Sequence, residues 1–97
     1  MDIEITAMRK VAEPKPNKSH DMIVANFDAV VGPLCLHNCA LVKIYNKNGE
    51  VYKGLAAWPP YIVTGRGDRG VRVIDREFQK ELRKAARDVY FALGGEE

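Results

Sequence analysis

The chain has 97 residues, of which 46% are hydrophobic and 29% charged, and its formal net charge is +2. This length and composition indicate one small domain over residues 1–97 and exclude a second domain of ordinary size. No apolar run approaches the roughly 18 residues of a membrane span, and the acidic, alternating start is unlike a secretory signal, so we expect a cytoplasmic protein without a membrane anchor. Because the whole chain is not a polycation, nucleic-acid binding would depend on where its basic residues lie.

Two strands are predicted in the first third of the chain. Apolar and polar residues alternate over residues 2–12, and the alternation returns over residues 21–31. Residues 13–20 contain two prolines and a polar cluster, which predict a loop between these strands. Gly32 and Pro33 then mark the end of the second strand.

A hairpin is predicted next. Residues 34–45 are apolar on both faces, which is typical of a central strand. The Asn-Gly pair at 48–49 supplies the positive backbone angle of a tight turn, so residues 50–57 are expected to pair antiparallel to that strand. The prolines within residues 58–61 end the pairing. A short apolar stretch at 71–74, after a glycine-rich loop, is a candidate fifth strand.

The segment from Asp75 to Gly95 is predicted to be a helix. Asp75 suits an N-cap, Glu77 lies in the first turn, and Gly94 and Gly95 mark the end. With the strands, this helix predicts an α+β fold, a small antiparallel sheet of four to five strands with a C-terminal helix. At about 100° per residue, apolar residues fall on one expected core face: Phe78, Leu82, Ala85, Ala86, Val89 and Leu93.

Basic residues gather opposite that core face and in the loop before the helix. Residues 66–87 hold eight basic and four acidic residues, so this segment carries +4 and the rest of the chain −2. Like charges four residues apart, such as Arg83 and Arg87, mildly destabilise an isolated helix, so the stripe favours a phosphate-binding role. A solvated face with surface ion pairs, such as Glu81 with Lys84, is an equally open interpretation. The candidate nucleic-acid-binding residues are Arg66, Arg69, Arg72, Arg76, Lys80, Arg83, Lys84 and Arg87.

A cluster at residues 35–39 raises metal binding and catalysis as further interpretations. Cys35, His37 and Cys39 alternate onto one strand face, and thiolate and imidazole are zinc ligands. Residues spaced by two project in parallel along a straight strand and do not converge, and His20 would have to be the fourth ligand, so we expect no metal site. We also expect no enzyme and no cofactor, because no glycine-rich oxyanion loop accompanies the thiols. The two cysteines lie about 13 Å apart along a strand, which favours reduced thiols.

Several short motifs resemble the stage V sporulation protein G family. Residues 5–11, ITAMRKV, are similar to that family's first strand, in which an aliphatic-Thr-x-aliphatic-Arg pattern recurs. The pair at 37–38 stands where the family has His-Asp in an apolar strand, 48–49 matches its hairpin turn, and 90–94 matches a terminal Tyr-x-x-Leu-Gly. The chain departs from the family at 57–60, where a Met-Pro-Ser-Lys segment is replaced, and in a longer connection between the second and third strands.

The resemblance implies a homodimer that binds DNA or RNA with little sequence preference and regulates transcription. By position, the predicted helix corresponds to the family's nucleic-acid-contacting segment. We therefore predict a non-enzymatic, dimeric nucleic-acid-binding regulator, in which Tyr90 or Phe91 stacks on bases. Dimerisation would also pair exposed sheet edges. The alternative is a protein-interaction module, whose basic stripe docks an acidic partner and whose aromatic corner at 58–61 anchors it.

Overall fold

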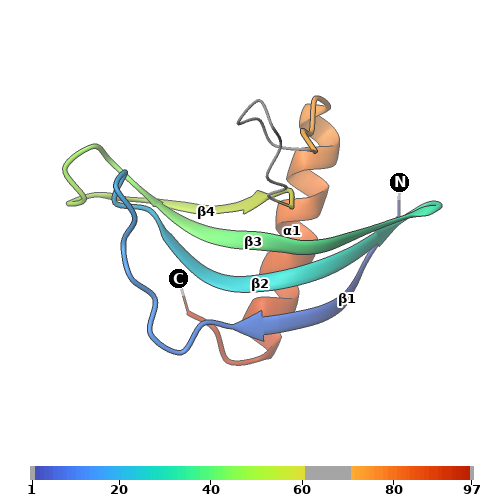
Figure 1. Cartoon of the computed structure of the whole chain (residues 1–97), viewed down its shortest axis with the longest axis horizontal. Coiled ribbons are helices and arrows are strands. Elements are labelled where there is room, and N and C mark those ends of the chain that lie inside the picture. The colour runs from blue at the N-terminus through green and yellow to red at the C-terminus, as the bar shows by residue number, and fades with distance from the viewer. Residues whose placement is uncertain (1, 61–70, 97) are drawn as a thin grey trace, which may run out of the picture.

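The computed structural model describes residues 2–60 and 71–96. In these ranges the chain forms β1 (Ile3–Lys10), β2 (Met22–Val31), β3 (Leu34–Tyr45), β4 (Tyr52–Trp58) and α1 (Arg76–Ala92). The strands form one antiparallel sheet in the order β1-β2-β3-β4, and α1 runs across one of its faces (Figure 1). The predicted α+β fold is confirmed.

The structure confirms the bounds predicted for β3 and adjusts the others. β4 begins at Tyr52, two residues later than predicted, because the Asn46 side-chain oxygen accepts hydrogen bonds from the backbone N–H groups of Glu50 and Val51 and holds both in the turn. β1 ends at Lys10, before the predicted end at residue 12. The fifth strand at 71–74 was a wrong prediction, since this segment is an irregular lead into the helix.

The hydrophobic core lies between α1 and the face of the sheet that α1 covers. Phe27 of β2, Leu41 of β3 and Leu82 of α1 are among the largest fully buried side chains. Burying apolar area of this kind contributes most of the favourable free energy of folding. The core cluster consists of Val24, Ala25, Phe27, Ala29, Cys39, Leu41, Leu55, Ala57, Leu82, Ala86 and Tyr90.

The buried side of α1 is rotated relative to the prediction. Leu82 and Ala86 are buried as expected, but Tyr90 is only 7% exposed, while Leu93 is 49% exposed. Leu93 is the C-cap, and Gly94 follows it with a φ of 89°, so the chain turns away from the core before Leu93 can pack. The prediction of Leu93 as a core residue was therefore wrong.

Side chains from both ends tie α1 to the outer strands. The Asp75 carboxylate caps the helix by accepting from the backbone N–H groups of Glu77 at 2.8 Å and Phe78 at 3.2 Å. The Gln79 amide donates to the Ala57 carbonyl of β4. At the other end, Lys10 Nζ of β1 donates to the Leu93 carbonyl at 2.8 Å. A positive charge at this C-terminal end also interacts favourably with the helix dipole. These contacts fix how α1 lies across the sheet.

Candidate nucleic-acid interface

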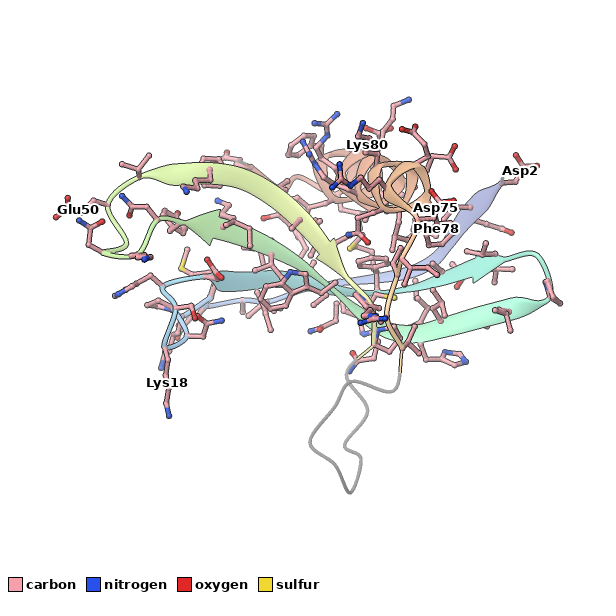
Figure 2. All side chains as sticks on the ribbon, turned by 90° about the horizontal axis from the view of Figure 1, so that it is seen from above. Asp2, Lys18, Glu50, Asp75, Phe78 and Lys80 are labelled. Atoms are coloured by element: carbon pink, nitrogen blue, oxygen red, sulfur yellow. The ribbon has the colours of Figure 1, made fainter. Side chains whose placement is uncertain are left out.

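The two flanks of α1 carry opposite charges. Figure 2 looks along the helix and shows nitrogen-ended side chains, Lys80 among them, on its outer surface and toward the β3–β4 turn, where Glu50 is labelled. Oxygen-ended side chains project on the other flank, toward Asp2. On that flank Asp2, Glu81 and Asp88 line a shallow hollow that Lys84 also borders. The helix therefore separates most of its bases from Glu81 and Asp88, as predicted, with Lys84 at the boundary.

The basic flank is a compact cluster. Lys80, Arg83, Lys84 and Arg87 together line a shallow hollow of about 210 Å³. We call these four residues the basic cluster. Arg76, one helical turn earlier, is also exposed. Four cations around one hollow form a concentrated positive surface that can receive an anionic group.

Ion pairing neutralises little of the basic cluster. Lys80 Nζ lies 3.6 Å from Glu77 Oε1, and both side chains are well exposed, so this pair contributes little stability. Among the described residues no ion pair joins Arg83, Lys84 or Arg87 to a carboxylate. Most of the positive charge is therefore available to an external partner.

Arg72 does not join this cluster. It lies in the lead to the helix and borders an apolar hollow of about 340 Å³, which Val31 and Leu34 at the β2–β3 turn also line. Arg66 and Arg69 lie outside the described residues. Of the six predicted residues that the structure describes, it thus brings four together around one hollow.

The predicted aromatic contacts are only partly possible. Tyr90 is buried in the core, so the prediction that it stacks on bases was wrong. Phe91 is 39% exposed and packs beside Tyr90, with the ring centroids 6.0 Å apart. Of Tyr90 and Phe91, only Phe91 has a ring that a base could reach.

A second group of suitable side chains lies on the sheet and was not among the predicted site residues. Leu41 of β3 faces the core, so alternation places Lys43 and Tyr45 on the same face of the sheet, beyond the area that the helix covers. A bulge then sets two residues of β4, Tyr52 and Lys53, opposite Tyr45. Two aromatic and two basic side chains thus lie on the part of the sheet toward which the basic flank of α1 points. The alternation was visible in the sequence, but the position of the helix was not.

The cluster at residues 35–39 contains a β-bulge. Phe27 pairs with Cys39 and Ala29 with Leu36, so the two β3 residues between them face Asp28 alone. Asn38 adopts a φ of 63°, and its backbone N–H donates to Asp28 Oδ1 at 2.8 Å. Arg9 NH2 lies 3.3 Å from the same oxygen, and His37 Nδ1 lies 3.5 Å from Oδ2. The hydrogen bond from Asn38, followed by those from Arg9 and His37, holds the pKa of the Asp28 carboxyl below its ordinary value.

The bulge corrects the expectation that both cysteines and His37 share one strand face. Cys39 turns into the core, whereas Cys35 and His37 are exposed, with Cys35 Sγ 3.8 Å from His37 Nδ1. Burial raises the pKa of the Cys39 thiol to about 11, which keeps it protonated and weakly nucleophilic at neutral pH. Within residues 2–60 and 71–96, no group of three or more metal-ligating side chains converges.

Comparison of the chain with known protein families, curated proteins and solved structures finds no match. The resemblance to the sporulation protein family thus stays a prediction. No helix in the described part of the chain is long and apolar enough to cross a bilayer.

Proposed function

We propose that the protein is a non-enzymatic nucleic-acid-binding regulator that contacts phosphates through the basic cluster on α1. The observation that supports this function best is the group of four cations around one hollow, three of which have no ion-pair partner among the described residues. Arginine and lysine side chains release condensed counterions when they neutralise phosphates, so the binding free energy grows with the number of contacts. Phosphate contacts also carry little sequence information, which fits binding of either DNA or RNA.

The proposed function can be tested by changing charge in the basic cluster without changing its bulk. We expect Arg83→Gln with Arg87→Gln to weaken binding to labelled DNA and RNA oligonucleotides at about 150 mM salt, measured by fluorescence anisotropy. The effect should exceed tenfold, because hydrogen bonds between charged groups contribute about 1.5–3 kcal/mol each.

Two lysines in the β1–β2 loop provide a control with the same loss of charge. Lys15 and Lys18 are both exposed, and Figure 2 shows Lys18 on the opposite side of the sheet from α1. Lys15→Gln with Lys18→Gln should therefore leave the affinity nearly unchanged. Equal losses in both double variants would mean that only net charge matters, and the basic cluster would have no special role.

An acidic protein could be attracted to the same surface by the same Coulomb forces. That alternative predicts negligible nucleic-acid binding by the unaltered protein at about 150 mM salt. It also predicts that the Arg83→Gln, Arg87→Gln variant no longer binds an immobilised acidic partner, whereas the Lys15→Gln, Lys18→Gln variant still does.

We also propose that the protein is a homodimer, although the sheet edges are a poor place for it. β1 has a register shift between Ile5 and Ala7, and β4 has one opposite Tyr45, and such bulges blunt edge pairing. A better surface is the apolar patch beside the β2–β3 turn, where Leu34 is 62% exposed and Ile74 83% exposed. Pairing two copies there would remove these side chains from water.

A further inference from the structure

The basic flank of α1 stands beside the part of the sheet that the helix leaves uncovered. This arrangement indicates which kind of nucleic acid fits. Resting on the proposed function, we infer that the ligand is single-stranded, with its phosphates on the basic cluster and an unpaired base on Tyr45 of the sheet. The basic flank of α1 points toward the β3–β4 turn, as Figure 2 shows. Tyr45 and Tyr52 pair across β3 and β4 beside that turn, and alternation from Leu41 puts Tyr45 on the face of the sheet that α1 covers in part.

The two tyrosines form an aromatic platform. They are cross-strand neighbours whose ring centroids lie 5.6 Å apart with planes tilted by 53°, and both side chains are half-buried. Packing against each other limits the freedom of the rings, so little conformational entropy is lost when a base stacks on them. Base stacking on an aromatic ring is tolerant of sequence, because every base has a π-face.

Tyr45 also borders a hollow that suits a flat heterocycle. Together with His20, Met22 and Asn48 it lines a space of about 280 Å³, close to the lower end of the roughly 300–1,000 Å³ found for small-ligand pockets. Asn48 offers a side-chain amide and His20 an imidazole, and both types of group hydrogen-bond to base edges. The His20 ring lies beside Gly49 of the β3–β4 turn.

Cations accompany this aromatic platform on the sheet. Lys43, which pairs with Leu55, precedes Tyr45 by two residues on β3. Lys53 is the exposed extra residue of the bulge opposite Tyr45. Basic side chains next to stacking rings are the combination that single-strand-binding surfaces use. A duplex cannot use the rings, because its bases are already stacked and paired, so the platform favours an unpaired strand.

The test compares a labelled 12-nucleotide oligothymidine, an oligouridine of the same length and a mixed-sequence duplex, each titrated by anisotropy. We expect the unaltered protein to bind the single strands more tightly than the duplex. Tyr45→Leu should weaken single-strand binding by about 5- to 150-fold, the range for removing one stacked base, and should leave duplex binding and the salt dependence unchanged. Tyr45→Phe keeps the ring and should retain most of the affinity.

Phe91→Leu tests the other candidate stacking ring, because it removes the exposed ring of α1 and leaves the sheet intact. It should have little effect on single-strand binding. Equal losses from Tyr45→Leu and Phe91→Leu, or no loss from Tyr45→Leu in a folded protein, would overturn the platform.

The outcomes separate this inference from the proposed function. Equal binding of duplex and single strand, with a response to the Arg83 and Arg87 changes alone, would overturn the inference and leave the proposed function standing. Binding to none of the three probes would overturn both.

A crosslink provides a measurement on the unaltered protein, in case Tyr45→Leu does not fold. Single-stranded DNA with 5-iodouracil, irradiated in complex, should crosslink to the peptide that contains Tyr45 or to the one that contains Tyr52, as identified by mass spectrometry. Crosslinks only to peptides of α1 or of β1 would contradict the proposed path of the strand.

Discussion

Asp28 shows how a single residue can determine which way a strand faces. Its carboxylate binds the Asn38 backbone N–H, and Asn38 has the positive φ that lets β3 take in an extra residue. Asparagine tolerates this left-handed conformation better than most residues, and the hydrogen bond offsets the remaining cost. By moving Cys39 into the core and leaving His37 outside, this contact separates the side chains that the sequence had placed together.

The lowered pKa of Asp28 predicts how stability depends on pH. The native state favours the ionised carboxylate, so its contribution is fully present above the ordinary pKa of 3.8 and is lost as the pH falls through the lower folded value. We expect Asp28→Asn to lower the midpoint of urea unfolding at pH 7. The difference from the unaltered protein should narrow as the pH falls below 3.8 and through the lower folded pKa, because the carboxyl then becomes uncharged like the asparagine amide. A difference that stays constant between pH 7 and pH 2.5 would mean that the ionised form makes no special contribution.

Among the elements, those defined by local chemistry were predictable from the sequence. β3 was predicted with its observed bounds, because twelve residues with an apolar majority run directly into an Asn-Gly turn. The start of α1 was predicted from Asp75, whose capping role needs only the next three residues. Features that depend on distant partners were missed. Tyr90 replaces Leu93 in the core because of how α1 crosses the sheet, and the aromatic platform depends on the register of β3 with β4.

The Asp75 cap of α1 is expected to contribute measurably to the stability of the protein. Asp75→Ala removes the acceptor for two backbone N–H groups and should lower the free energy of unfolding by about 0.5–2 kcal/mol. Asp75→Ser retains an acceptor and should recover most of that loss. The measurement is urea unfolding followed by circular dichroism at 222 nm. Equal destabilisation by both substitutions would show that the negative charge matters and the cap does not.

For the whole molecule, the proposed dimer predicts both a mass and a surface. Light scattering should give twice the chain mass of 10.9 kDa. Leu34→Glu places a charge in the exposed apolar patch and should restore the single-chain mass without unfolding the protein, since Leu34 is largely exposed in one chain. Leu93→Glu, on the exposed C-cap of α1, is the control and should leave the mass at the dimer value. A single-chain mass for the unaltered protein would contradict the dimer.

The whole molecule is also electrically polar. Its net charge is only +2, yet most cations of α1 gather on one flank, while Glu81 and Asp88 lie on the other. The sequence predicted this separation, because charge periodicity along a helix is a local property. It could not predict that the cationic flank faces an open surface with two tyrosines, because that depends on which strands the helix crosses.

Phosphate binding by the basic cluster is tested most directly by the salt dependence of single-strand binding, with the unaltered protein compared to the Arg83→Gln, Arg87→Gln double variant. Each phosphate contact contributes about 0.7 to the slope of log affinity against log salt for a single strand. If both arginines contact phosphates, the slope of the double variant should be smaller by about 1.4. An unchanged slope in the arginine variant would show that the basic cluster does not contact the nucleic acid.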